Sequence, residues 1–252
     1  MAYRRFYIEP EMLSEHGVHL RGDLVHHIRD VCRFGVGDTF EVLPGDGRAW
    51  LVQITSADSR EISAKKLSER ALETLPRPHI TLALSLPKLP KVDWIVEKCV
   101  ELGVAEIRPF VSDYSFLRKV SEISPNRIER WKKLVQGATQ QSGRGELMQI
   151  AGPTSLKNLL AEFNRSESTG GLFPYEGEAR LGIAEALRAL REKKLDHLWV
   201  FVGSEGGFST QEVQQFAEVG LNPVSLGSQI LRVETACLAL VSVIKYENEQ
   251  FR

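Results

Sequence analysis

The sequence has few of the residues that disulfide-rich or cysteine-ligated metal proteins need. Its three cysteines, Cys32, Cys99 and Cys237, are far apart, and none belongs to a Cys-x-x-Cys pair. This spacing excludes a disulfide framework and gives no sign of a cysteine zinc site. Two of the six histidines, His26 and His27, are adjacent and point apart on a helix, so we expect no bound metal.

Long apolar runs and an excess of one charge are also lacking. No uninterrupted apolar run is long enough to span a bilayer, and the N-terminal MAYRRFYIEP lacks the apolar core of a signal peptide. The 32 Lys and Arg residues are balanced by 33 Asp and Glu residues, for a net charge of −1. This balance excludes a wholly basic nucleic-acid coat protein, although it allows a local basic patch. We therefore expect a cytoplasmic protein without a membrane partner.

The chain has two regions of different pattern. Residues 1 to about 70 contain short strand patterns bounded by Gly, Asp and Pro, with one helix near Asp23–Arg33, as is typical of a small barrel. ALETLPRP (71–78), with two prolines, is a predicted linker. Beyond it, apolar runs such as Leu198–Val202 alternate with helical patterns, which predicts a parallel sheet covered by helices. Ser166–Gly171 is predicted to be a small flexible loop.

The segment FVGSEGGFST (201–210) joins an apolar strand to a helix through a glycine-rich bend. Ser209 and Glu212 have the spacing of a capping box at the start of that helix. The glycine spacing is neither that of a dinucleotide fingerprint nor, without a following Lys-Ser/Thr, that of a Walker loop. Such a bend either holds a ligand against exposed backbone N–H groups or is a tight turn without a ligand. The spacing alone leaves both alternatives open.

A second loop of this type lies in SLGSQILRVETACLAL (225–240). A strand ends at Leu226, and an almost wholly apolar helix begins near Glu234. Because parallel strands end at the same edge of a sheet, this loop and Gly203–Gly207 are expected on one rim. Arg232 and Glu234 would lie near that rim, either as an ordinary ion pair at the helix start or as functional residues.

Two segments carry basic residues suited to RNA. Residues 118 to 133 contain six basic residues and two acids, a pattern that suits a phosphate backbone but also an ordinary solvated helix face. Near the N-terminus, arginines lie beside Phe6 and Tyr7, which would add the stacking surface used in RNA recognition. The candidate RNA-binding residues are Arg4, Arg5, Arg29, Arg33, Arg118, Lys119, Arg127 and Arg130.

Taken together, these segments resemble the RsmE family, bacterial methyltransferases that act on uridine N3 of 16S ribosomal RNA. FVGSEGGFS and LGSQILRVETA are similar to the family's IGPEGGFS and LGPRILRTETA. RRFY, HHIRDVCR, LPKLPKVDWIVEKCVELGV and RIERWKKLVQGATQQSGR also match the family, and all the motifs appear in its order. Three positions depart from the pattern: Ser204 replaces proline, Ser228-Gln229 replaces Pro-Arg, and Val233 replaces threonine.

The resemblance implies an α/β protein of the SPOUT class. Residues 1–72 would form a PUA-like RNA-binding β-barrel, and residues 73–252 a trefoil-knotted, parallel-sheet methyltransferase domain. The expected function is S-adenosylmethionine-dependent methylation of N3 of a specific uridine in the decoding region of 16S rRNA, within the small ribosomal subunit, by a homodimer that uses no metal. The alternative is a catalytically weak RNA-binding or ribosome-assembly protein of the same fold, because the three departures leave activity open.

The resemblance also implies roles for individual residues. The target base must be unpaired and swung into the site, and Arg232 is the candidate to stabilise negative charge on the uridine carbonyls as N3 loses its proton. Glu234 would orient Arg232 or accept the proton, Arg144 would act as a second cation or hold a phosphate, and Glu205 would contact the ribose or close the turn. The expected cofactor-binding residues are Val202, Gly203, Ser204, Glu205, Gly206, Gly207, Leu226, Gly227, Ser228, Gln229, Ile230, Leu231, Thr235 and Ala236.

Overall fold

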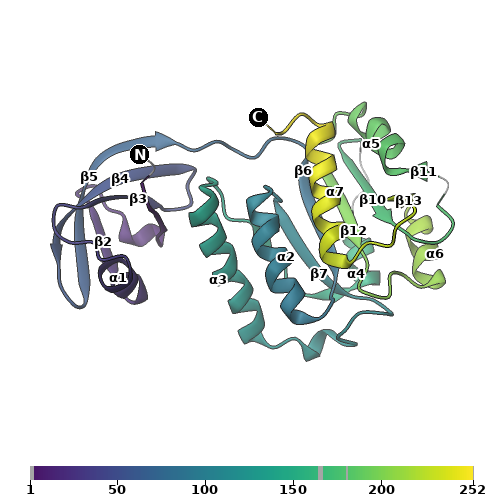
Figure 1. Ribbon diagram of the computed structural model, residues 1–252, viewed down its shortest axis with the longest axis horizontal. Coiled ribbons are helices and arrows are strands. Elements are labelled where there is room, and N and C mark those ends of the chain that lie inside the picture. The colour runs from purple at the N-terminus through teal and green to yellow at the C-terminus, as the bar shows by residue number, and fades with distance from the viewer. Residues whose placement is uncertain (1–2, 164–166, 180, 252) are drawn as a thin grey trace. The chain divides into compact units, whose positions relative to one another are not determined.

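The computed structural model describes residues 3–163, 167–179 and 181–251. The chain forms two compact units, the first extending to Thr74 and including Gln136–Leu147, the second comprising Leu75–Val135 and the chain from Met148 onward (Figure 1). The domain boundary between residues 72 and 73 stays a prediction. Among the described helices, none has the length and apolarity needed to cross a membrane. No cluster of three His, Cys, Asp or Glu residues in the described ranges is arranged to hold a metal ion.

The first unit is built on a five-stranded sheet in the order β1-β3-β4-β5-β2. A short helix, α1 (Asp23–His26), continues as a π-helical turn, His27–Val31, and packs beside β2. The predicted β-rich region with one helix is therefore confirmed. The strands are β1 (Arg5–Tyr7), β2 (Val18–Arg21), β3 (Thr39–Leu43), β4 (Arg48–Ala57) and β5 (Glu61–Ala71).

The second unit contains an eight-stranded sheet in which every described pairing is parallel. Seven strands follow the order β11-β13-β10-β12-β6-β7-β8, and β9 also pairs with β7. The parallel sheet expected from the alternating pattern is thus confirmed. The strands are β6 (His79–Ser85), β7 (Glu106–Val111), β8 (Gln149–Ile150), β9 (Thr154–Ser155), β10 (Thr169–Pro174), β11 (Leu181–Gly182), β12 (His197–Val202) and β13 (Pro223–Ser225).

Helices cover this sheet because each buries an apolar stripe. Helix α2 packs beside α7, which also packs against β12, and α4 packs against α6 and β7 (Figure 1). Phe163, Phe173, Phe201 and Phe216 fill the core between the sheet and the α4–α6 pair. The helices of this unit are α2 (Leu89–Glu101), α4 (Leu156–Glu162), α5 (Ile183–Arg191), α6 (Thr210–Glu218) and α7 (Val233–Glu247), while α3 (Pro125–Ser142) begins in this unit and ends in the first.

Strand β10 corrects the expectation of a flexible loop at Ser166–Gly171. Ser166 lies outside the described residues, but Thr169–Gly171 belong to β10, which lies between β12 and β13. A Cβ on Gly170 would lie 2.4 Å from the Leu195 side chain, and one on Gly171 would lie 2.9 Å from Phe163. These glycines therefore allow neighbouring side chains to pack onto a strand, and they do not mark a loop.

Candidate active site

The loops that follow β12, β10 and β13 meet in one pocket. Because these strands are parallel, all three end at the same edge of the sheet. The two glycine-containing loops found in the sequence thus lie on one rim, as predicted, with the end of β10 between them. The pocket is lined by Pro174, Tyr175, Glu176, Val202, Gly203, Ser204, Gly207, Phe208, Leu226, Gly227, Gln229, Ile230, Leu231, Val233 and Ala236.

The first wall is a tight bend at Gly203–Gly207. The Gly207 N–H donates to the Ser204 carbonyl at 2.9 Å, which closes the turn. Gly207 has a φ of +67°, a conformation that L side chains rarely adopt. A Cβ on Gly203 would lie only 2.9 Å from the Gly207 backbone. Two glycines are therefore required for the bend to close.

The bend is held by polar contacts on both sides. The Ser204 hydroxyl donates to the Tyr114 carbonyl at 2.6 Å. Beyond the bend, Ser209 and Glu212 form the predicted capping box of α6, with distances of 2.9 and 3.2 Å. The buried Glu212 carboxylate also accepts the Asp113 N–H at 2.8 Å, and burial raises its pKa. The first wall is thus fixed before any ligand binds.

The second wall, Leu226–Leu231, is more open. Its residues from Gly227 to Ile230 are exposed, and Ile230 is 82% exposed although it lines the pocket. The Gly227 N–H donates to the Ser225 hydroxyl at 3.2 Å, and Gly227 has a φ of +114°. This wall presents exposed side chains, Gln229 and Ile230, to the pocket.

A third wall, Pro174–Glu176, was missed by the sequence analysis. It follows directly from β10, and the Tyr175 N–H donates to the Val224 carbonyl at 3.0 Å. Glu176 contributes the one carboxylate among the described lining residues. The sequence signal was hidden because β10 was interpreted as a loop, so its end was not expected at the rim.

Lys91, on α2, joins the two predicted loops. Its ammonium lies 3.2 Å from the Glu205 carboxylate and 3.1 Å from that of Glu234. Glu205 also accepts the Lys88 N–H at 3.4 Å, and it does not line the pocket. These contacts favour a turn-closing role for Glu205 over a ribose contact. No local spacing in the sequence indicated Lys91, because its partners are more than 100 residues away.

The Lys91 ammonium and the Glu205 and Glu234 carboxylates stabilise each other's charged forms. Partial desolvation lowers the pKa of Lys91, but hydrogen bonds to Glu234 and Glu205 outweigh it, so the net shift is upward. The Glu234 carboxylate accepts a hydrogen bond from its own backbone N–H, which is the main cause that lowers its pKa. Partial desolvation raises this pKa, but the hydrogen bond from Lys91 lowers it further, so the net shift is downward. Both groups are therefore charged at neutral pH.

Arg232 is the N-cap residue of α7 and is exposed at the edge of the pocket. Among the described residues, Glu234 forms its ion pair with Lys91 and not with Arg232. The Lys91 contact thus leaves the Arg232 guanidinium exposed between two lining residues, Leu231 and Val233.

Ten of the fourteen expected cofactor residues line the pocket. Glu205, Gly206, Ser228 and Thr235 do not, and Arg144 belongs to the first compact unit. Assignments of function to these residues stay predictions. The lining residues that the sequence analysis missed are Pro174, Tyr175, Glu176, Phe208 and Val233.

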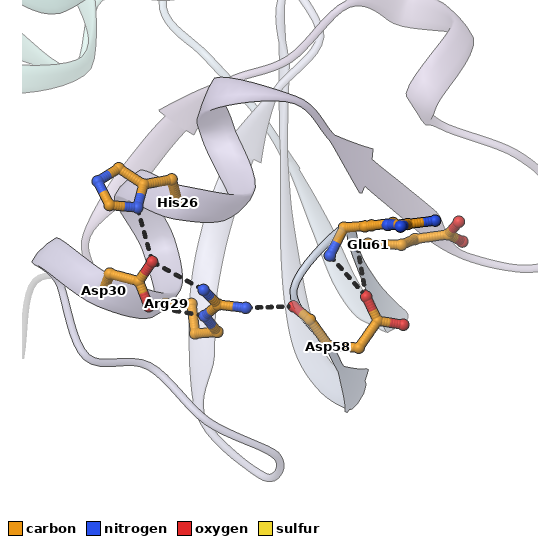
Figure 2. Close-up of polar contacts among 6 residues, drawn as sticks. His26, Arg29, Asp30, Asp58 and Glu61 are labelled. Carbon is orange, nitrogen blue, oxygen red and sulfur yellow. Dashed lines mark hydrogen bonds and ion pairs between the residues drawn. The ribbon is translucent and has the colours of Figure 1, made fainter.

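Arg29 is fixed within a polar network of the first unit (Figure 2). It donates to both Asp30 carboxylate oxygens, at 2.7 and 2.8 Å, and to the Asp58 carbonyl at 2.9 Å. His26 contacts the same Asp30 carboxylate at 2.6 Å. The hydrogen bond from Arg29 is the main cause that lowers the pKa of Asp30 to about 2. The Arg29 charge is therefore largely balanced within the protein.

The other N-terminal candidates differ in accessibility. Phe6 is 2% exposed in the core of the first unit, so the expectation that it offers stacking surface is wrong. Its place in β1 turns the ring inward. Arg5 pairs with Glu41 at 3.1 Å, whereas Arg4 and Arg33 are exposed. Arg4 also donates to the Cys32 sulfur at 2.8 Å.

In the second unit, acidic partners balance part of the basic segment. Asp93 accepts from Arg130 at 2.8 Å and from the Trp131 indole at 3.0 Å, and it lies 3.7 Å from Arg127. Arg118 donates to the Asp113 carbonyl, while Lys119 is exposed. Residues 118–133 therefore offer less unpaired positive charge than the amino-acid composition of this segment indicates.

Comparison with known proteins identifies the family. Residues 73–245 match the model of the RNA methyltransferase domain, and residues 20–67 match that of the RNA methyltransferase PUA domain. The chain belongs to the RsmE family of RNA methyltransferases. This RNA methyltransferase is 34% identical to the Ribosomal RNA small subunit methyltransferase E of Aquifex aeolicus, over 89% of this chain and 92% of the relative. It is 30% identical to that of Bacillus subtilis, over 92% and 91%.

Solved structures share the whole architecture. A Ribosomal RNA small subunit methyltransferase E from Neisseria gonorrhoeae, bound to S-adenosyl methionine, superposes with a TM-score of 0.84 at 29% identity, over 97% of both chains. A Legionella pneumophila methyltransferase with bound cofactor has a TM-score of 0.85 at 22% identity, over 98% of both chains. The expected SPOUT-class α/β fold with an N-terminal PUA domain is therefore confirmed for this RNA methyltransferase.

Two departures from the family motifs fit this structure without loss of the pocket. Ser204, in place of proline, donates its hydroxyl to Tyr114 and lines the pocket. Val233, in place of threonine, is buried as the first residue of α7. At the third departure, Gln229 stands where the family motif has arginine. Gln229 is exposed in the open wall, which therefore lacks the positive charge of that arginine.

Proposed function

We propose that this RNA methyltransferase transfers a methyl group from S-adenosylmethionine to N3 of a uridine in the decoding region of 16S rRNA, within the small ribosomal subunit. The observation that carries this proposal is the meeting of Gly203–Gly207 and Leu226–Leu231 in one pocket. The names of the curated relatives, which specify ribosomal RNA of the small subunit, support the substrate class. The cofactor-bound N. gonorrhoeae structure supports the cofactor.

The pocket residues fit this cofactor. Apolar side chains such as Val202, Phe208 and Leu231 suit an uncharged adenine, and the glycine bends expose backbone polar groups to it. No lysine or arginine is found among the described lining residues, so the pocket lacks a phosphate cradle. The Glu176 carboxylate provides negative charge for a cation. Bound there, S-adenosylmethionine would supply an electrophilic methyl group on a positively charged sulfur.

Arg232 is the proposed catalytic residue for the RNA substrate. Methylation would form the bond between N3 and the methyl carbon, break the methyl–sulfur bond to release neutral S-adenosylhomocysteine, and pass the N3 proton to solvent. As N3 loses this proton, negative charge would spread to the flanking carbonyl oxygens. The exposed guanidinium of Arg232, next to the pocket, would donate hydrogen bonds to such an oxygen and so stabilise the charge. Glu234 is better suited to hold the start of α7 through Lys91, because its lowered pKa makes it a weak base.

We assign RNA binding to the first unit and to the exposed basic residues of the second. The match of residues 20–67 to an RNA methyltransferase PUA domain supports this assignment. Arg4, Arg33 and Lys119 are the exposed candidates with the most accessible charge. Such contacts bind the phosphate backbone without reading sequence, so a folded target in the assembled subunit would supply specificity.

A homodimer is the proposed functional unit. Helix α7 buries one face against the sheet and α2, yet Val243 and Tyr246 on its other face are 38% and 77% exposed. Apolar side chains exposed on a central helix favour a subunit contact. Light scattering should give twice the chain mass, and a single-chain mass would contradict this part of the proposal.

The direct test is transfer of a radiolabelled methyl group to small ribosomal subunits from a strain that lacks the modification. We expect label in the subunits, and mass spectrometry of nuclease fragments should place it on N3 of one uridine. Protein-free 16S rRNA is the control and should accept much less label. Label on another base or another atom would contradict the assigned specificity.

The alternative, a catalytically weak RNA-binding protein, is tested by cofactor titration. Calorimetry should detect binding of S-adenosylmethionine to the parental protein. Absence of binding would favour the alternative. We expect the Arg232→Ala variant to bind S-adenosylmethionine with the parental affinity but to transfer no methyl group. That result would support the proposed role of Arg232 in catalysis.

A further inference from the structure

The loop that follows β7 lies on the same rim as the cofactor pocket, and its aromatic residues have no role in the function proposed so far. β7 is parallel to β6 and β6 to β12, so all three end at one edge. The Phe116 N–H donates to the Leu86 carbonyl, beyond the end of β6, at 2.9 Å. The loop therefore crosses the rim beside the strand that leads into the first bend.

This loop is internally fixed and presents two aromatic side chains. Ser115 is 1% exposed, and its hydroxyl donates to the Leu117 carbonyl at 2.7 Å while accepting the Ser112 N–H at 3.1 Å. On either side of it, Tyr114 and Phe116 are 49% and 52% exposed. A buried serine thus holds the backbone between two half-exposed aromatic residues. Rigid aromatic side chains lose little conformational entropy when they bind.

Tyr114 is in direct contact with the first bend. Its carbonyl accepts the Ser204 hydroxyl at 2.6 Å, and its Cβ would be 2.7 Å from a Cβ on Gly206. The backbone at Tyr114 and the proposed cofactor-binding bend are therefore one packed unit, and the Tyr114 side chain lies against the bend at Gly206.

Exposed basic residues occur in the segments that carry and adjoin the two rings, together with the exposed Asp113. Lys88 follows β6 and is exposed, and Arg118 and Lys119, which come after Leu117 in the same loop, are also exposed. Exposed aromatics among basic residues are the combination that single-stranded RNA recognition uses, because every base has a stacking face and every nucleotide a phosphate.

We propose that Tyr114 and Phe116 form a stacking platform for unpaired RNA bases beside the target uridine. This inference rests on the proposed function and deepens it. Removing the target base from its stack leaves neighbouring bases exposed, and aromatic rings on the rim replace those lost contacts. The platform accounts for the exposure of two large aromatic side chains on an otherwise fixed loop.

The test compares Tyr114→Ala and Phe116→Ala with the parental enzyme in methyl transfer to small ribosomal subunits. We expect the KM for subunits to rise about tenfold in each variant, since stacking contributes that much per base. Calorimetric affinity for S-adenosylmethionine should stay within about twofold, which also verifies folding. Tyr114→Phe and Phe116→Tyr keep a ring and should retain the parental KM.

Phe251→Ala is the matched control, because Phe251 is 53% exposed and follows the end of α7 distant from the pocket. It should leave the KM for subunits unchanged. An unchanged KM in both rim variants would overturn the platform while leaving the proposed function intact. A change in molecular mass would assign the rings to a subunit contact and also overturn it. A parental protein that transfers no methyl group would overturn both proposals.

Discussion

Two of the three walls of the candidate active site differ in how firmly they are held. Gly203–Gly207 is closed by a backbone hydrogen bond, fixed to Tyr114 through Ser204, and joined to α2 through Lys91. Leu226–Leu231, in contrast, exposes four consecutive residues, including Ile230 at 82%. One pocket is therefore built from a fixed wall and an open wall.

This difference has a physical consequence for cofactor binding. A preorganised wall costs little conformational entropy when a ligand binds, whereas an exposed wall must become ordered around the ligand. Exposed apolar side chains such as Ile230 would be buried in that step. We infer that the fixed wall sets the position of the cofactor and that the open wall controls its entry and release.

The largest effect is expected from Gly203→Ala in the fixed wall. The added Cβ would lie 2.9 Å from the Gly207 backbone, which cannot move without opening the bend. A clash of this kind costs about 3 kcal/mol, so affinity for S-adenosylmethionine should fall about a hundredfold in calorimetry. Gly182→Ala is the matched control, because nothing lies within 4 Å of its new Cβ. Equal affinities in the two variants would refute the fixed wall.

The next effect is expected from Lys91→Met, which keeps the length of the side chain and removes its charge. Glu205 and Glu234 would then face each other without a cation, and affinity for S-adenosylmethionine should fall about tenfold. Lys91→Arg should restore most of that affinity. Lys98→Met on the same helix, which breaks only a pair with Glu101, should have almost no effect. If the Lys91→Met and Lys98→Met variants bind S-adenosylmethionine with equal affinity, the contacts of Lys91 with Glu205 and Glu234 do not position the loops.

A smaller effect is expected from Ser204→Ala. Loss of the hydrogen bond to the Tyr114 carbonyl should lower the free energy of unfolding by about 1 kcal/mol, as measured by urea denaturation. Ser228→Ala in the open wall should change it by less than about 0.5 kcal/mol. A larger loss of stability in Ser228→Ala than in Ser204→Ala would contradict the conclusion that Gly203–Gly207 is the more firmly held wall.

The smallest effect is expected from pH in the neutral range. The pKa of Glu234 is lowered from 4.5, so its contribution is present above that value and is lost as pH falls through the folded pKa. The pKa of Lys91 is raised from 10.5, so its contribution is present below that value and is lost as pH rises through the folded pKa. The folding stability that this ion pair contributes should thus be constant between about pH 6 and pH 9, as measured by urea denaturation of the parental protein and Lys91→Met. A stability difference that is lost with a midpoint near pH 7 would show that another group controls the pair.

Local sequence patterns predicted the features that depend on neighbouring residues. Strand β12 and the Ser209–Glu212 capping box occur as expected, because periodicity and cap spacing are properties of short segments. The shared rim of two loops also followed from the rule for parallel strands. The trefoil knot, in contrast, was implied only by family resemblance.

Features that depend on distant residues were not predictable in this way. Gly170 and Gly171 indicated a loop, but they serve close packing in a central strand, and the third wall of the pocket was lost with that strand. Lys91 contacts one partner in the Gly203–Gly207 bend and one in the first turn of α7, which no spacing in the sequence reveals. Phe6 shows the opposite error, because an aromatic beside arginines was assigned to the surface although its strand turns it inward.

A crystal structure with S-adenosylmethionine tests the central claim most directly. The account predicts the cofactor between residues 203–207 and 226–231, with the first segment unmoved and Ile230 covered by the ligand. A cofactor bound away from these two segments would contradict it.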